Sequence, residues 1–175
     1  MTAKSRFFFV AFVISLALDQ ITKTWVVATL AFSDRVSVIE GFFYLTHVRN
    51  PGAAFSLFAD APAAIRSPFF IGTTLIAIGL ILSFFRKLSP GDRLSALALG
   101  LILGGAVGNL LDRLIYGAVV DFLRLQLWAG YTWPDFNVAD SSIVVGVALL
   151  VIELFASEGE SLAAPPGTEP DSARH

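Results

Sequence analysis

The sequence contains no cysteine and only two histidines, His47 and His175, among its 175 residues. Without cysteine the chain can form no disulfide, no thiolate nucleophile and no cysteine-ligated metal centre. A site with several histidine ligands is excluded as well, since His175 is the last residue. We therefore expect no metal and no other cofactor. Any chemistry must come from carboxylates, hydroxyls, amides, lysine and arginine.

Charge is also scarce. Charged residues make up 15% of the chain and hydrophobic residues 55%, with a mean hydropathy of +0.74. Ordinary globular domains carry roughly 25% charged residues. The formal net charge is −2 and no basic tract is present, so nucleic acid is not expected as a partner. This composition is typical of an integral membrane protein.

Four apolar runs are long enough to cross a hydrocarbon core, which requires about 20 residues. They lie near residues 7–30, 67–85, 94–116 and 138–155. Backbone groups must be paired within the segment in lipid, and no array of alternating strands typical of a barrel is present. The sequence therefore predicts a membrane all-α bundle of four transmembrane helices, forming a single domain over residues 1–156.

The basic residues predict the orientation of this bundle. Arg86, Lys87 and Arg93 crowd the short link between the second and third runs, and Lys4 and Arg6 precede the first. The positive-inside bias places that link and both termini in the cytoplasm. Loops 31–66 and 117–137 then face outward. The tail over residues 157–175 is rich in Glu, Pro, Ser, Gly and Ala, which predicts a disordered cytoplasmic segment.

The outer loops carry strand patterns. Residues 36–39 and 43–48 alternate in polarity around Glu40-Gly41, which predicts a hairpin. Residues 123–128 alternate as well and could add a third strand. We expect a small sheet on the periplasmic side that rests on the membrane. Its aromatic side chains at headgroup level would be Trp128, Tyr131 and Trp133.

Two aspartates are the leading candidates for function. Asp121 lies in Val119-Val120-Asp121-Phe122 and Asp140 follows Asn137, each where an apolar run meets a polar connection. An ionisable residue at such depth is energetically costly and marks a functional site by default. In the predicted orientation both lie at the outer rim. Such a pair suggests shared-proton chemistry on a substrate at the membrane surface.

Structural explanations for both aspartates stay open. Asn137 can cap the fourth helix, which puts Asp140 at the third helical position, where an acidic residue favours the helix dipole. This role is compatible with catalysis, because a helix start also fixes a carboxylate in place. We expect Asp121 in a loop, where it could simply be solvated.

Polar residues inside the spans give further candidates. Asp19 and Lys23 are spaced to pair on one face of the first helix, either as a structural ion pair or as support for a site. In the third helix, one stripe carries polar groups that we interpret as functional and a glycine and a tyrosine beside them: Gly105, Asn109, Asp112, Arg113 and Tyr116. Taken alone, the sequence Asn50-Pro51-Gly52 is typical of an ordinary turn and predicts no particular function.

Five short motifs follow one another in a fixed order. They are Asp19-Gln20-x-x-Lys23, Asn50-x-Gly52-Ala53-Ala54-Phe55-Ser56, Gly108-Asn109-x-x-Asp112-Arg113, Val119-Val120-Asp121-Phe122 and Phe136-Asn137-x-Ala139-Asp140-Ser141. Each is weakly specific alone, but together on four spans they are highly specific. In this order and spacing the chain resembles the bacterial lipoprotein signal peptidases (signal peptidase II) over roughly residues 18–142.

The resemblance implies an aspartic endopeptidase of the bacterial inner membrane, with its catalytic dyad at Asp121 and Asp140. Its substrates would be prolipoproteins that carry a diacylglyceryl group on the lipobox cysteine, cut just before that cysteine among membrane lipids. Globomycin-type cyclic peptides would inhibit it. We predict that eight further residues position the substrate or support the dyad: Asn50, Gly52, Asn109, Asp112, Arg113, Asn137, Asp19 and Lys23.

The chemistry of paired carboxylates fits that implication. Two close carboxylates share one proton; the ionised one draws a proton from water and the protonated one polarises the scissile carbonyl. The sequence leaves open which aspartate holds the proton.

Two other functions remain as alternatives. The first is a membrane protease with Ser56 or Ser141 as nucleophile and Lys23 as base. The second is a small proton-coupled transporter or channel subunit, although the sequence has no internal repeat and no pair of broken helices.

Overall fold

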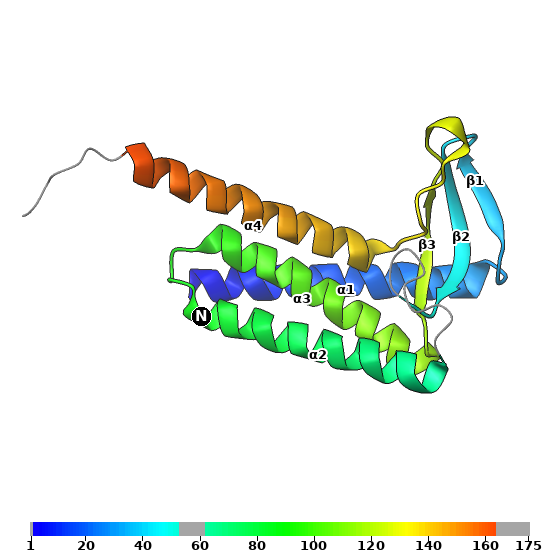
Figure 1. Cartoon of the computed structure of the whole chain (residues 1–175), viewed down its shortest axis with the longest axis horizontal. Coiled ribbons are helices and arrows are strands. Elements are labelled where there is room, and N and C mark those ends of the chain that lie inside the picture. The colour runs from blue at the N-terminus through cyan, green and yellow to red at the C-terminus, as the bar shows by residue number, and fades with distance from the viewer. Residues whose placement is uncertain (1, 53–61, 164–175) are drawn as a thin grey trace, which may run out of the picture.

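The computed structural model describes residues 2–52 and 62–163, which form four long helices and a small sheet at one end of them (Figure 1). The helices are α1 (Ala3–Thr29), α2 (Ala63–Lys87), α3 (Arg93–Tyr116) and α4 (Val138–Ala163). Each contains a stretch long and apolar enough to cross a membrane. The predicted four-helix membrane fold is therefore confirmed.

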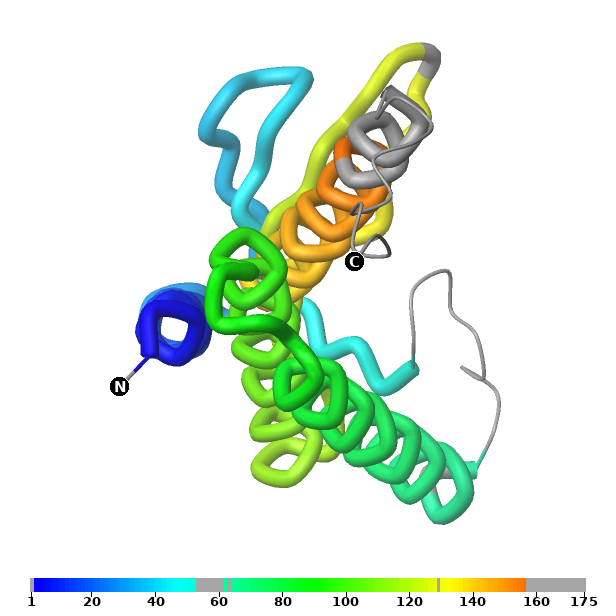
Figure 2. The backbone as a smooth tube through the Cα atoms, turned by 90° about the vertical axis from the view of Figure 1, so that its left-hand side faces the viewer, coloured from blue at the N-terminus to red at the C-terminus, as the bar shows by residue number. Residues whose placement is uncertain are grey.

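Helix α3 is the centre of the bundle. Figure 2 shows α1, α2 and α4 arranged around it, and α3 packs against all three. One apolar core joins Phe8 of α1, Ile81 of α2 and Leu99 of α3. A second core at the other end joins Val26 of α1 to Val120 of the sheet. The faces turned away from α3 are apolar and exposed, as expected for helices surrounded by lipid.

The helix boundaries differ from prediction mainly at the ends. The first helix begins at Ala3 and not near residue 7, and the second begins at Ala63, which shortens the predicted outer loop. Helix α4 begins at Val138, as predicted, but continues to Ala163, so the first part of the predicted tail is helical. The rest of that tail, residues 164–175, lies outside the described residues.

The sheet has three antiparallel strands in the order β1-β2-β3: β1 (Arg35–Ile39), β2 (Phe43–Asn50) and β3 (Val119–Leu125). The predicted hairpin is confirmed, with Gly41 at φ 76° in its turn. The sheet lies where α1 and α3 end and α4 begins, at the opposite end from the N-terminus and the α2–α3 link (Figure 1). Strand β3 starts directly after α3, because Gly117 ends that helix with a left-handed φ of 69°.

The expected loop position of Asp121 is wrong. Asp121 lies within β3, paired opposite Val48 of β2, and only 2% of its surface is exposed. The third strand thus begins before the predicted start at residue 123 and ends at Leu125. Residues 119–122 are all buried, so the alternation by which strands are recognised is absent where this strand starts. Trp128 lies in a 3₁₀ turn that reverses the chain.

Glycines on α3 allow its close contacts. A Cβ at Gly105 would collide with the carbonyl oxygen of Ala139 in the first turn of α4. A Cβ at Gly108 would collide with the carboxylate of Asp19 on α1. These two contacts bring together the helices that carry most of the polar residues described below.

We expect Gly105→Ala to lower the Tm of the protein in detergent, because the backbone of Ala139 cannot move without shifting α4. Overpacking of this kind costs about 1–3 kcal/mol. The matched control is Gly79→Ala on α2, where nothing lies within 4 Å of the added Cβ. Equal Tm values for the two variants would contradict the packing described here.

Candidate active site

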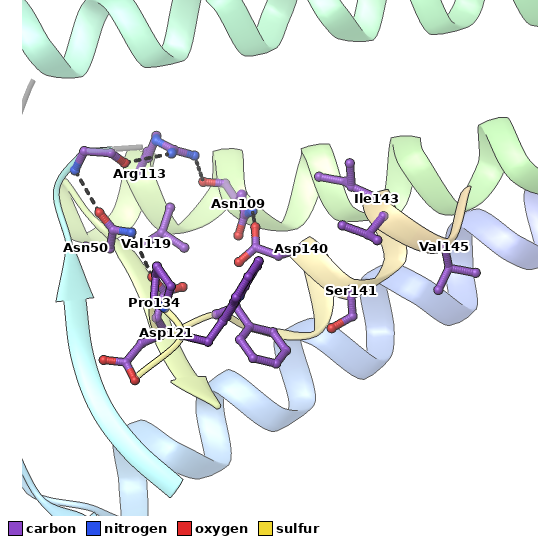
Figure 3. Close-up of a pocket in the computed structure, with 15 residues that line it drawn as sticks. Asn50, Asn109, Arg113, Val119, Asp121, Pro134, Asp140, Ser141, Ile143 and Val145 are labelled. Carbon is purple, nitrogen blue, oxygen red and sulfur yellow. Dashed lines mark hydrogen bonds between the residues drawn. The ribbon is translucent and has the colours of Figure 1, made fainter. Parts of the chain in front are cut away.

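A cavity of about 560 Å³ opens between the sheet, α3 and the start of α4 (Figure 3). Its wall combines β2, α3, β3, the segment Trp133–Phe136 and the first turns of α4. The side towards α4 is apolar, with Ile143, Val144 and Val145. The polar side chains that line it are Asn50, Asn109, Arg113, Asp121, Asp135, Asp140 and Ser141.

Asp121 is held by two amides on the cavity wall. Asn50 Nδ2 donates to Asp121 Oδ2 at 2.9 Å, and Asn137 Nδ2 donates to Asp121 Oδ1 at 2.7 Å. Asn50 is itself fixed, since its Oδ1 accepts a hydrogen bond from the N–H of Gly52 at 3.0 Å. Both carboxylate oxygens of Asp121 therefore have a donor, and the residue lines the cavity.

Burial and, next in importance, the neighbouring charge of Asp140 raise the pKa of Asp121 from 3.8 to about 7 in all. The hydrogen bonds from Asn50 and Asn137 and the charge of Lys23 oppose this rise. Asp121 therefore keeps its proton as pH rises to about 7. Perturbed carboxylates in a cavity are typical of catalytic groups.

Asp140 is fixed by the start of α4, as predicted. Asn137 Oδ1 accepts from the N–H of Asp140 at 2.9 Å, and Asp140 Oδ2 accepts from the N–H of Asn137 at 3.2 Å. This reciprocal pair is a capping box. Asn109 Nδ2 donates to the other carboxylate oxygen, Asp140 Oδ1, at 2.8 Å. Asn137, with none of its surface exposed, thus bonds both aspartates and brings them to one cavity.

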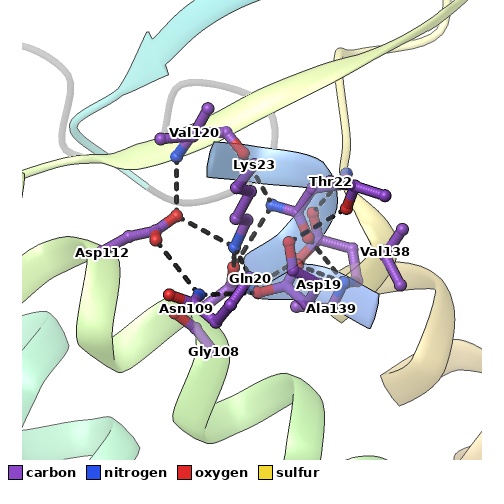
Figure 4. A network of polar contacts seen from close by, with 12 residues as sticks. Asp19, Gln20, Thr22, Lys23, Gly108, Asn109, Asp112, Val120, Val138 and Ala139 are labelled. Carbon is purple, nitrogen blue, oxygen red and sulfur yellow. Dashed lines mark hydrogen bonds and ion pairs between the residues drawn. The ribbon is translucent and has the colours of Figure 1, made fainter. Parts of the chain in front are cut away.

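Lys23 lies behind the cavity in a cage of three acceptors (Figure 4). Its ammonium is 2.9 Å from Asp19 Oδ2, 2.9 Å from Asp112 Oδ2 and 2.9 Å from Asn109 Oδ1. Only 3% of Lys23 is exposed. The pairing of Asp19 with Lys23 predicted from their spacing is present, and Asp112 on α3 completes it.

The predicted polar stripe of α3 divides between two neighbours. Asp112 faces α1, while Arg113 faces the cavity and donates to the carbonyl oxygen of Gly52 at 3.4 Å. Tyr116 is nearly half exposed and lies against the guanidinium of Arg49, 4.0 Å from ring centre to Cζ. Of the eight predicted supporting residues, four line the cavity together with the two aspartates: Asn50, Gly52, Asn109 and Arg113. The other four lie behind the cavity wall: Asp19, Lys23, Asp112 and Asn137.

Two parts of the site were not predicted. Gln20 donates to Asp19 Oδ2 at 3.1 Å and to the carbonyl oxygen of Gly108 at 3.3 Å; its place in the first motif could have indicated this. Arg124 forms a bidentate ion pair with Asp135, with Nε 2.7 Å from Oδ1. That pair ties the cavity wall at Trp133–Phe136 to β3, and nothing in the sequence pattern indicates it.

The serine and lysine alternative finds no support among the described residues. The side-chain nitrogen of Lys23 is bonded to Asp19, Asp112 and Asn109, and no hydrogen bond within the described part of the chain joins it to Ser141. Ser141 Oγ donates to the carbonyl oxygen of Asn137 at 3.0 Å. Ser56 lies outside the described residues.

The sequence profile of the family described as Signal peptidase (SPase) II matches residues 11–156, which is most of the chain. The chain belongs to the signal peptidase II family. Membership makes it a peptidase and a lipoprotein signal peptidase, as the motifs predicted. It also fits a protein of the bacterial inner membrane.

Curated relatives agree with the signal peptidase II assignment. The lipoprotein signal peptidase of Geobacter sulfurreducens is 49% identical over 144 residues, covering 82% of this chain and 88% of the relative. That of Listeria monocytogenes is 41% identical over 143 residues, covering 82% and 89%.

Solved structures show the same fold. A bacterial membrane enzyme determined by the in meso method at 2.3 Å resolution superposes with a TM-score of 0.79, at 31% identity, over 93% of this chain and 94% of that one. A second, at 1.9 Å resolution, gives a TM-score of 0.75 at 33% identity, over 84% and 91%.

The raised pKa of Asp121 predicts how stability depends on pH. Because the folded pKa lies above the unfolded one, the contribution of Asp121 to stability is fully present below about pH 4 and is lost as pH rises through about 7. We expect the Tm of the parent in detergent to fall across this window, and Asp121→Asn to fall less. The control Asp34→Asn, at an exposed site, should keep the parental slope. A variant Asp121→Asn with that same slope would contradict the prediction.

Proposed function

We propose that this signal peptidase removes the signal peptide from diacylglyceryl-modified prolipoproteins, cutting just before the lipidated cysteine, with Asp121 and Asp140 as its catalytic dyad. The observation that carries the proposal is the single cavity lined by both carboxylates, with the buried amide of Asn137 bonded to each. Family membership supports the lipoprotein substrate.

The proton positions follow from burial. Asp121, with its pKa raised to about 7, holds the shared proton and polarises the scissile carbonyl. Asp140 accepts a proton from a water molecule, whose oxygen attacks the carbonyl carbon while Asp121 gives its proton to the carbonyl oxygen. The tetrahedral diol then collapses: Asp140 protonates the leaving amine and Asp121 recovers a proton from the diol. No covalent enzyme intermediate forms, in keeping with a chain that has no cysteine.

The remaining cavity residues suit an extended peptide that carries lipid. Asn50, Gly52 and Arg113 offer polar groups on the side away from α4, where the peptide backbone would lie. The apolar side at residues 143–145 would leave the acyl chains in contact with lipid. Partitioning of those chains supplies about 0.8 kcal/mol per buried CH₂. A globomycin-type cyclic peptide would compete for the same cavity.

The proposed orientation places the sheet and the cavity at the periplasmic face, with both termini in the cytoplasm. The basic residues of the α2–α3 link and of the N-terminus lie at the end of the bundle away from the sheet (Figure 1). This distribution agrees with the positive-inside bias.

We expect Asp121→Asn and Asp140→Asn each to abolish cleavage, with a loss of about 10³-fold or more, because either change removes one half of the acid–base pair. The parent and both variants would be purified in detergent and mixed with a diacylglyceryl-modified prolipoprotein or its unlipidated counterpart. Release of the signal peptide would be followed on a gel.

The matched control is Asp34→Asn, an exposed aspartate on the same side of the membrane in the proposed orientation. It should cleave as the parent does. Cleavage by both dyad variants would reject the dyad, and equal cleavage of the unlipidated substrate would reject the lipid requirement.

The proton on Asp121 also predicts a pH dependence for catalysis. Cleavage should fall as pH rises above about 7, since the pair then loses the proton that polarises the carbonyl. The measurement is kcat/KM against pH with the lipidated substrate. A rate that stays constant to about pH 9 would contradict Asp121 as the acid.

A further inference from the structure

The two amide side chains at the dyad, Asn109 and Asn137, have chemically different ends. Nδ2 can only donate a hydrogen bond and Oδ1 can only accept one. An amide turned by 180° would have the same shape but would present a lone pair where a donor stood. The orientation of these two amides therefore decides whether the carboxylates meet donors or acceptors.

Lys23 determines the orientation of the first amide. An ammonium has three donors and no acceptor, so only an oxygen can lie 2.9 Å from Lys23 Nζ, and that oxygen is Asn109 Oδ1. The other two donors are used by Asp19 and Asp112. The ammonium is thus held from both α1 and α3 and cannot turn away.

The first amide then matches the second, which backbone groups also hold: Asn137 Nδ2 donates to the carbonyl oxygen of Val120 at 3.3 Å and Asn137 Oδ1 accepts from the N–H of Asp140. With its oxygen towards Lys23, Asn109 turns Nδ2 towards Asp140 Oδ1, at 2.8 Å. The same Asn109 oxygen accepts from Asn137 Nδ2 at 3.2 Å. Asn137 Nδ2 also donates to Asp121 Oδ1, and Asn137 Oδ1 faces the N–H of Asp140. One ammonium outside the cavity lining thereby turns the N–H of Asn109 towards Asp140.

We propose that Lys23 is a positioning residue for catalysis, which sets the orientation of the Asn109 amide so that its N–H faces Asp140 and its oxygen accepts from Asn137. This inference rests on the proposed function of the dyad. It assigns to Lys23 a task that an ion pair serving only stability would not have.

The charges around the site support a measurable effect. Lys23 and the Asn137 hydrogen bond both lower the pKa of Asp121, against burial and the charge of Asp140. The other charged groups near Lys23 are Asp19 and Asp112, and Arg113 lies beside the dyad. Loss of Lys23 should therefore move the high-pH fall in cleavage to still higher pH.

The test compares Lys23→Met, Lys23→Arg and the control Ser15→Ala, which removes another buried polar group on the same face of α1. We expect Lys23→Met to lower kcat by about tenfold to a hundredfold, with little change in KM. Losses of this size are usual when a residue that orients a functional side chain is removed, as measured for the hydrogen-bond partners of metal ligands. The high-pH fall should shift upward. Lys23→Arg, which also only donates, should recover part of kcat. Ser15→Ala should keep the parental pH profile.

A double-mutant cycle with Asn109→Ala distinguishes an effect of Lys23 that acts through Asn109 from a direct effect of the Lys23 charge on the dyad. If Lys23 acts through Asn109, adding Lys23→Met to Asn109→Ala lowers kcat little further. Fully multiplied losses in kcat would overturn the proposal, as would a parental kcat and pH profile in Lys23→Met. Failure of the parent itself to cut the lipidated substrate would reject the proposed function instead.

Lys23→Met leaves two buried carboxylates without their cation and could fail to fold. The second variant therefore combines Lys23→Met with Asp112→Asn. In it, Asp19 keeps donors from Gln20 and from the N–H of Ala139. Tm in detergent shows which variant is folded, and the kinetics are read on that one. If neither folds, Lys23 serves the fold itself and the positioning role is rejected.

Discussion

A buried charge inside a membrane bundle must be paired, and the fold depends on one such pairing. Lys23 lies between the carboxylates of Asp19 and Asp112, each 2.9 Å away, and almost none of the three side chains is exposed. Removing any partner would leave an uncompensated charge, whose cost in a low dielectric is several kcal/mol. The cluster therefore fixes α1 against α3, and its further bonds to the N–H groups of Val120 and Ala139 fix β3 and α4 as well.

The sequence predicted those features that depend on local pattern. The hydropathy and length of the apolar runs predicted the four helices, and the alternating polarity around Glu40-Gly41 predicted the hairpin. The spacing of Asn137 and Asp140 predicted that Asn137 caps the fourth helix, and this cap is confirmed. Asp19 and Lys23 could be paired from their spacing because both lie on one helix. The roles assigned to the candidate catalytic residues stay predictions, although the structure places the polar ones in or directly behind one cavity.

Features that depend on packing between distant segments could not be predicted. The start of β3 is buried on both faces, so it lacks the alternation that reveals a strand, and Asp121 was expected in a loop. Asp112 meets Lys23 only because the glycines of α3 let α1 approach closely. The bond between Arg124 and Asp135 depends on a chain reversal at Gly130 that leaves no hydrophobic period. In each case the partner is chosen by the three-dimensional arrangement and not by neighbouring residues.

The two aspartates are carried by different kinds of element, a strand after the third helix and the first turn of the fourth. During synthesis the fourth helix is the last to enter the membrane, so Asp140 reaches Asp121 only when insertion is complete. A chain halted earlier holds just one of the two carboxylates. The order of the segments thus ties the completed cavity to completed insertion, because a partly inserted molecule lacks the wall that the fourth helix provides.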